Sequence, residues 1–193
     1  MPKLALLVID MQHDFVDPSG VYPCVDASTK VLAIKKLADL ARATGVPVIY
    51  TKEVHRVQKV DFGRELDGGR LFHCLEGTLG AEIVEELSPH ESDYVVEKRR
   101  LSGFFGTDLE MLLRGLGVAT LYLTGAATDI CVHYTAVDAY QHGFSVRIVE
   151  DCVAGTSKAA HEASLSLLKE RLRKESVIQS SSVIEDFRGR SRK

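Results

Sequence analysis

The segment LALLVI at residues 4–9 is a continuous run of apolar residues that ends at Asp10. Such a run is typical of a strand in a parallel sheet, because helices cover both faces of the sheet and bury the strand completely. Further short apolar runs alternate with amphipathic stretches of helical periodicity along the chain. This alternation predicts an α/β fold in which a parallel sheet carries helices on both faces.

The same patterns set the expected elements along the chain. Strands are expected at residues 4–9, 46–51, 94–97, 118–124, 144–150 and 177–178. Helices are expected at residues 27–44, 78–87, 107–117, 129–142 and 158–174. We expect one domain over residues 1–193, a lid or pocket segment at 52–77, where periodicity is lost, and a frayed basic tail at 188–193.

Composition excludes several classes of protein. The 193 residues include 24 basic and 27 acidic side chains, a net charge of −3, which excludes a general nucleic-acid binder. No apolar run approaches the roughly 20 residues of a membrane span, and no signal peptide fits the first residues. Cys24, Cys74, Cys131 and Cys152 form no C-x-x-C pair, so we expect free thiols and a cytoplasmic protein.

Three reactive side chains follow expected strands. Asp10 follows the first strand, Lys98 the third, and Cys131 begins the helix after the fourth. The carboxyl ends of parallel strands share one edge, so the three are expected to meet there. Taken singly, each has a plain alternative: a loop carboxylate for Asp10, a surface charge for Lys98 and a small buried thiol for Cys131.

Together the three side chains form a coherent chemical set. A nearby ammonium and a helix N-terminus favour a thiolate, so we expect the pKa of Cys131 to lie below the ~8.5 of a free thiol. Asp10 can accept the thiol proton and pass it to a leaving amine. The small residues of Gly125-Ala126-Ala127 allow a sharp turn whose N–H groups can face an oxyanion.

Three motifs carry a resemblance to a known family. They are D-x-Q-x-D-F at residues 10–15, K-x-x-x-S-x-F-x-x-T-x-L at 98–109 and T-G-x-x-T-x-x-C-V at 124–132. Their order and spacing resemble those of the isochorismatase-like cysteine hydrolases from residue 3 to about residue 187. The resemblance implies a three-layer α/β/α fold around a six-stranded parallel sheet. It also implies that Cys131 is the nucleophile, Asp10 the general acid and base, and Lys98 their electrostatic partner.

The resemblance implies further site residues. A non-proline cis peptide is expected between Ala126 and Ala127, with the backbone N–H groups of Ala127 and Cys131 as oxyanion donors. Phe15 and Phe104 match positions that line the family's pocket, and a role as plain core aromatics is the alternative for both.

The family includes nicotinamidase, N-carbamoylsarcosine amidase, ureidoacrylate and biuret amidohydrolases, and isochorismatase. Members that keep the cysteine mostly cleave amide-like C–N bonds, so Cys131 favours hydrolysis of a small amide, carbamoyl or ureido compound through a thioester. The alternatives are isochorismatase-type vinyl ether hydrolysis and a non-catalytic binding protein. Family members commonly form dimers and tetramers, so a homo-oligomer is expected.

The nicotinamidases of this family hold a divalent ion through a D-x-H pair after the second strand and a later histidine. By resemblance Glu53, His55 and His73 occupy these places, and Asp61 stands at a further ligand position. The ion would be zinc, iron or manganese. Glutamate is one methylene longer than aspartate, so the alternative is an ion-pair network without a metal, as in the family's metal-free amidases.

Overall fold

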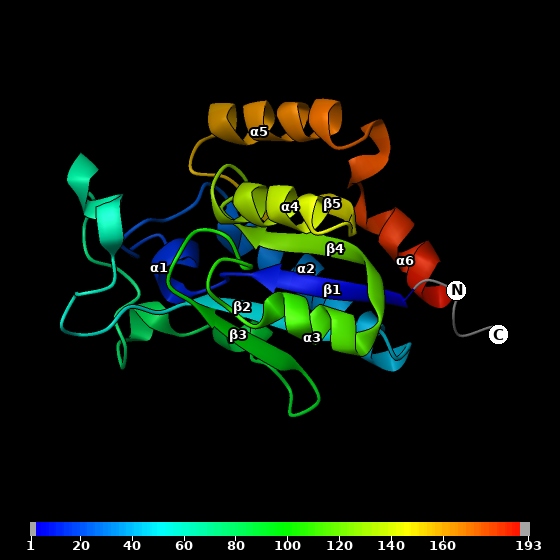
Figure 1. Cartoon of the computed structure of the whole chain (residues 1–193), viewed down its shortest axis with the longest axis horizontal. Helices are drawn as coiled ribbons and strands as arrows, with labels where there is room; N and C mark the ends of the chain where they lie inside the picture. The colour runs from blue at the N-terminus through cyan, green and yellow to red at the C-terminus, as the bar shows by residue number, and fades with distance from the viewer. Residues whose placement is uncertain (1–2, 190–193) are drawn as a thin grey trace.

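The central strand of the sheet is β1 (Lys3–Ile9), which pairs in parallel with β2 (Val48–Glu53) on one side and β4 (Val118–Ala126) on the other. The other strands are β3 (Tyr94–Lys98), β5 (Ser145–Ala154) and β6 (Val177–Ile178). The strand order is β3-β2-β1-β4-β5-β6, and every pair is parallel. This computed structural model, which describes residues 3–189, confirms the six-stranded parallel sheet (Figure 1).

Helices form a layer on each face of the sheet (Figure 1). The helices are α1 (His13–Val16), α2 (Ala27–Ala43), α3 (Leu109–Leu116), α4 (Cys131–Gln141), α5 (Lys158–Arg171) and α6 (Ser180–Arg188). Side chains of β1 alternate between two cores: Leu6 and Val8 pack with α2 and α6, whereas Leu7 and Ile9 pack with α3, α4 and α5. The expected three-layer α/β/α arrangement is therefore confirmed.

The strand order reverses between β1 and β4, and ligand sites of open α/β sheets lie at such a point. Gly125 near the end of β4 has φ +110°, and a Cβ there would lie 2.0 Å from the carbonyl oxygen of Ile9. Only glycine permits this close approach of the two backbones. Asp10, the residue after Ile9, has a φ angle of +48°, and this conformation turns the chain at the edge of the sheet where the site forms.

The helix expected at residues 78–87 is wrong. The structure has two short 3₁₀ turns there, Leu79–Ala81 and Glu85–Leu87. The Gln12 side chain donates to the carbonyl of Ala81 at 2.7 Å, and Gln12 forms an antiparallel bridge with Ile83. These tertiary hydrogen bonds replace the helical ones and hold the segment extended against the end of β1.

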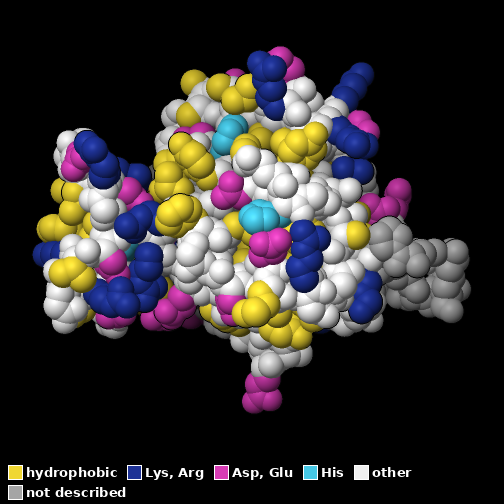
Figure 2. All heavy atoms as spheres, in the orientation of Figure 1, with side chains coloured by type: hydrophobic (Ala, Val, Ile, Leu, Met, Phe, Trp, Pro, Cys, Tyr) yellow, Lys and Arg dark blue, Asp and Glu magenta, His cyan; other side chains and the backbone are white. Residues whose placement is uncertain are grey.

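The segment at residues 52–77 leaves the carboxyl end of β2 and projects from this edge of the sheet (Figure 1). Beyond β2 its regular structure is a 3₁₀ turn, Gly63–Gly68. On the face seen in Figure 2, basic and acidic side chains of this region lie side by side. Among residues 3–189, no helix is long and apolar enough to cross a bilayer. Most of the tail expected at 188–193 lies outside the described residues.

Candidate active site

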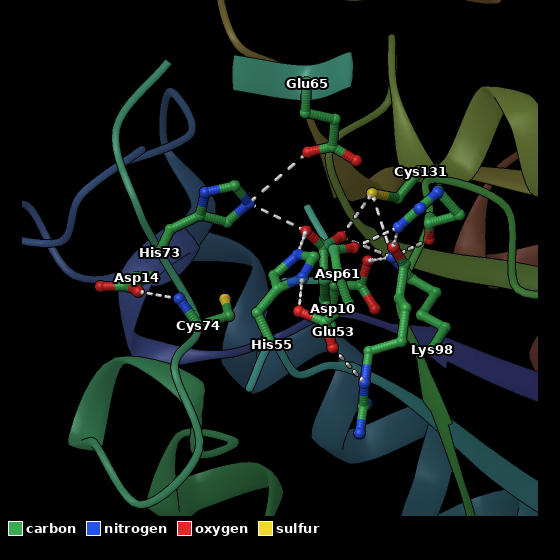
Figure 3. A network of polar contacts seen from close by, with 12 residues as sticks. Asp10, Asp14, Glu53, His55, Asp61, Glu65, His73, Cys74, Lys98 and Cys131 are labelled. Atoms are coloured by element: carbon green, nitrogen blue, oxygen red, sulfur yellow. Dashed lines mark hydrogen bonds and ion pairs between the residues drawn. The ribbon is translucent and has the colours of Figure 1, made fainter. Parts of the chain in front are cut away.

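Asp10, Lys98 and Cys131 meet at the edge of the sheet where the strand order reverses (Figure 3). Asp10 follows β1, Lys98 is the last residue of β3, and Cys131 is the first residue of α4. The Lys98 Nζ atom lies 2.8 Å from Asp10 Oδ2 and donates to Cys131 Sγ at 3.5 Å. All three residues are buried. The structure thus brings the predicted trio together.

Glu53 is a fourth member of this group. Its Oε2 atom accepts a hydrogen bond from Lys98 Nζ at 2.7 Å and lies 3.8 Å from Cys131 Sγ. The sequence suggested Glu53 for a metal site or an ion-pair network, and not as a partner of the trio. Its second role follows from the pairing of β2 with β3, which sets Glu53 opposite Lys98, and this register is not readable from the sequence.

The charges of the group stabilise one another. Burial alone would lower the pKa of Lys98, but Asp10, Cys131 and Glu53 outweigh burial and hold that pKa well above its usual value. Burial would raise the pKa of Glu53, and Lys98, His55 and His73 instead hold it well below its usual value. Lys98 is therefore an ammonium and Glu53 a carboxylate at neutral pH.

Asp10 is placed to accept a proton. Burial raises the pKa of Asp10, with Lys98 opposing and Glu53 adding to the rise. Its Oδ1 atom accepts a 2.6 Å hydrogen bond from the Thr51 hydroxyl. Its Oδ2 atom lies beside Lys98 but receives no aligned hydrogen bond from residues 3–189. This oxygen is therefore free to bond a thiol proton.

The expectation of a lowered thiol pKa is wrong. Burial raises the pKa of Cys131 well above its usual value; Lys98 opposes the rise, and Asp10 and Glu53 reinforce it. Two carboxylates and a dry environment outweigh one ammonium, and the contribution of Glu53 was absent from the sequence argument. The resting group is a neutral thiol, so its proton must leave as the sulfur attacks.

We expect alkylation of Cys131 by iodoacetamide in the free protein to accelerate with pH up to at least about pH 9, because a raised pKa keeps the thiol protonated below that value. Peptide mass spectrometry from pH 6 to 10 measures this rate. A Cys131→Ser protein reports labelling of the other thiols, among which burial raises the pKa of Cys24 and Cys152 to about 12. A plateau below pH 8 would contradict the direction of the shift.

The turn between β4 and α4 carries the predicted oxyanion donors. The peptide bond between Ala126 and Ala127 is cis, at the position that the resemblance implied. The Ala127 carbonyl accepts hydrogen bonds from the N–H groups of Ile130 and Val132. Within residues 3–189, the N–H groups of Ala127 and Cys131 donate no hydrogen bond, so both are available to a ligand. Their role as oxyanion donors stays a prediction.

A small cavity opens in front of the thiol. Among its lining residues are Phe15, Tyr22, Leu101, Ala127, Ile130 and Cys131. Phe15 is thus placed as expected. Phe104 does not line this cavity: its ring stacks on His142 with centroids 5.1 Å apart and packs against Phe144 in the core beneath α4. The apolar core offers this ring more burial than the pocket edge, so the alternative role as a core aromatic holds for Phe104.

Glu53 also joins a cluster of histidines and carboxylates (Figure 3). Its Oε1 atom lies 3.2 Å from His55 Nε2 and 2.9 Å from His73 Nε2. The Glu65 carboxylate lies 4.0 Å from His73 Nε2. One ligand atom from each of these four residues lies within 4.8 Å of all the others. The three metal candidates from the sequence are therefore together, with Glu65 as an unforeseen fourth.

Asp61, the further ligand position suggested by the resemblance, lies outside this set of four. It accepts hydrogen bonds from Arg56 and lies 3.4 Å from the far nitrogen of His55. Asp61 therefore lies on the far side of the His55 imidazole, while Glu65 faces the cluster. No sequence signal marked Glu65, because its place depends on the conformation of the projecting segment.

Comparisons with known proteins agree with this geometry. A family model described as the isochorismatase domain matches residues 4–180. A maleamate amidohydrolase of Pseudomonas putida is 34% identical over 176 residues, which cover 84% of this chain and 78% of that protein. A protein of Arabidopsis thaliana described as a probable inactive nicotinamidase is 33% identical over 171 residues, covering 86% and 87%.

A solved structure of a pyrazinamidase of Pyrococcus horikoshii in complex with zinc is similar over 92% of this chain and 99% of that one, with a TM-score of 0.83 and 34% identity. The chain belongs to the isochorismatase family.

Proposed function

We propose that this protein is a cysteine-dependent amidohydrolase that cleaves the C–N bond of a small amide, carbamoyl or ureido compound. One observation carries the proposal: a single ammonium, Lys98, holds the Asp10 carboxylate and the Cys131 thiol at one point beside a small cavity. The amidohydrolases among the relatives support the same reaction class.

The first half of the reaction forms a thioester. Cys131 Sγ attacks the substrate carbonyl carbon while Asp10 accepts the thiol proton. The N–H groups of Ala127 and Cys131 donate to the oxyanion of the tetrahedral intermediate. Asp10 then gives its proton to the leaving nitrogen, the C–N bond breaks, and ammonia or an amine departs.

The second half restores the free enzyme. Asp10, again a carboxylate, takes a proton from a water molecule that attacks the thioester carbonyl. The C–S bond breaks, the acid departs, and the proton returns to Cys131 Sγ. Lys98 touches both groups throughout, so its positive charge offsets the negative charge that moves between the carboxylate and the sulfur.

Ammonia release tests the proposal directly. We would screen nicotinamide, N-carbamoyl amino acids, ureidoacrylate, biuret and allophanate, and trap the acyl-enzyme on Cys131 for mass spectrometry. Release of ammonia with an acyl adduct on this residue supports the proposal. Turnover without any adduct, or no turnover of any amide, overturns it.

The histidine–carboxylate cluster fits a divalent ion. Both oxygens of Glu65 are buried and receive no hydrogen bond from residues 3–189. Two imidazoles and two carboxylates form the nitrogen and oxygen donor set that zinc prefers. We propose that Glu53, His55, Glu65 and His73 hold such an ion, which when bound would supply positive charge for orienting and polarising a substrate.

We expect protein purified without a tag to bind about one zinc ion per chain, and we expect His73→Ala to weaken that binding by more than about tenfold, because the cluster loses an imidazole. Equilibrium dialysis with elemental analysis measures the binding. His90→Ala, on the exposed surface, is the matched control and should bind zinc normally. If the protein binds no zinc and keeps full activity in EDTA, the metal proposal is wrong and the cluster is an ion-pair network.

A further inference from the structure

Two basic side chains, Arg70 and His73, line the cavity in front of Cys131 among the residues that the structure describes. The Glu53 carboxylate also lines the cavity, and its two oxygens are paired with His73 and Lys98. Other parts of the wall are apolar, with Phe15, Tyr22 and Leu101.

The nearby Lys98 does not line the cavity, and its ammonium is committed to Asp10 and to Glu53. Both ring nitrogens of His73 already have partners, Glu53 and the carbonyl of Leu71. A negative charge on a bound molecule would therefore be met by Arg70.

The surroundings of Arg70 hold its guanidinium in place without using its donors. The guanidinium carbon lies 4.8 Å from the centroid of the Tyr22 ring, a cation–π contact. The Tyr22 hydroxyl accepts a hydrogen bond from the N–H group of Leu71, which ties the ring to the residue after Arg70. Stacking against a ring occupies a face of the guanidinium and leaves its N–H groups, which point outward in the plane, free.

Arg70 has one ion pair, with Glu65 Oε2 at 4.0 Å, and this distance is too long for a hydrogen bond. Within residues 3–189, the Arg70 side chain makes no hydrogen bond. About a third of that side chain, 31%, is exposed. A stacked, half-buried arginine with unused donors at the wall of a small apolar cavity is arranged to bind a planar anion in a two-point contact.

We propose that Arg70 binds a carboxylate of the substrate, so that this site takes anionic amides: the monoamide of a small dicarboxylic acid, or a carbamoyl or ureido derivative of a small acid. The inference rests on the proposed amidohydrolase function and narrows its substrate class. An uncharged amide leaves the donors of Arg70 unused, whereas a carboxylate fills them while its amide end reaches the thiol. Arg70 is in this account a specificity residue and takes no part in the bond-breaking steps.

A pair of substrates that differ in charge tests the assignment. Maleamate carries a carboxylate, its methyl ester does not, and both release ammonia from the same amide. We expect Arg70→Gln to lower kcat/KM for maleamate by about 10- to 100-fold and to change kcat/KM for the ester by less than about twofold. Arg70→Lys should recover part of the loss, because lysine keeps the positive charge but cannot make the two-point hydrogen bond of a guanidinium.

The matched control is Arg64→Gln. Arg64 lies in the same projecting segment, is almost fully exposed and pairs with Asp67 of its own 3₁₀ turn. We expect this variant to treat both substrates as the unaltered protein does. An equal loss on both substrates in Arg70→Gln would show a structural role and would overturn the proposal, as would a preference of the unaltered protein for the ester.

A binding measurement separates this inference from the proposed function. Maleate and its uncharged diamide are compared as protectants of Cys131 against iodoacetamide, which requires no turnover. We expect maleate to protect the unaltered protein. For the same protection, Arg70→Gln should need a maleate concentration at least about tenfold higher. Protection by maleate without hydrolysis of any amide would support carboxylate binding by Arg70 and overturn the proposed amidohydrolase function. Absence of protection, or equal protection of both proteins, would reject the role of Arg70.

Discussion

Replacing Cys131 with alanine is expected to lower kcat/KM for amide hydrolysis by at least about 10⁴-fold, a loss of about 5.5 kcal/mol of transition-state stabilisation. The sulfur is the atom that bonds the substrate carbon. Within residues 3–189, no second thiol contacts Lys98 or Asp10, whose other polar partners are Glu53, Thr51 and the carbonyl of Arg100. Ammonia release under single-turnover conditions measures the loss.

Cys24→Ala is the control, because Cys24 also lines the cavity but has no contact with Lys98. We expect it to retain most of the activity. Hydrolysis of a vinyl ether substrate that survives in Cys131→Ala would favour the alternative of a vinyl ether hydrolase that does not need the thiol. A protein that turns over no substrate, with or without Cys131, would favour the non-catalytic binding protein.

Replacing Lys98 with methionine is expected to reduce kcat by more than tenfold and to destabilise the fold by about 3–5 kcal/mol. The ammonium is 1% exposed and lies within 2.8 Å of one oxygen of Asp10 and one of Glu53. Removing it leaves two buried carboxylates without this ammonium, and Glu53 keeps only its contacts with His55 and His73. Urea unfolding and steady-state kinetics measure the two effects.

The stability loss should depend on pH. In the unaltered protein the raised pKa of Lys98 means that its stabilisation is fully present below about pH 10 and is lost as pH rises through the folded-state pKa. The lowered pKa of Glu53 contributes stability above about pH 4 that is lost in acid. In Lys98→Met both carboxylates should take up protons on folding, so the variant loses stability as pH rises from about 5 to 8.

The difference between the two proteins should therefore be larger at pH 8 than at pH 5. The double variant Lys98→Met, Glu53→Gln removes one of the two buried carboxylates that lost their contact with the ammonium. It should therefore recover part of the stability. Lys35→Met, which removes an exposed i, i+4 pair with Asp39, should change stability by less than about 0.5 kcal/mol. Equal stability of Lys98→Met and the unaltered protein at pH 8 would contradict the argument.

Local patterns were sufficient to predict the sheet and the trio. The apolar run at residues 4–9 marked the central strand, and three motifs marked Asp10, Lys98 and Cys131, because each lies where a strand or a helix begins or ends. The expected helix at 78–87 failed because Gln12, distant in sequence, holds that segment in another conformation. Local sequence patterns do not report contacts between residues that are far apart in the chain.

The rest of the site depends on geometry that a sequence does not state. The contact of Glu53 with Lys98 requires the register of β2 against β3, and the places of Glu65 and Arg70 require the path of the projecting segment. The thiol pKa is a balance of burial and three charges, and burial, the largest cause of its rise, follows from tertiary packing that the sequence does not state. A homo-oligomer and a cytoplasmic location stay predictions.

The central position of β1 has a consequence for synthesis of the chain. β1 precedes the other described strands along the chain, but its neighbour β4 begins only at Val118. Until β4 is made, residues 4–9 present an unpaired edge of six apolar residues without charge or proline, the kind of segment that pairs with other chains. The nascent protein is therefore most prone to aggregation before Cys131 has been added, and its yield depends on protection of this one short segment during that interval.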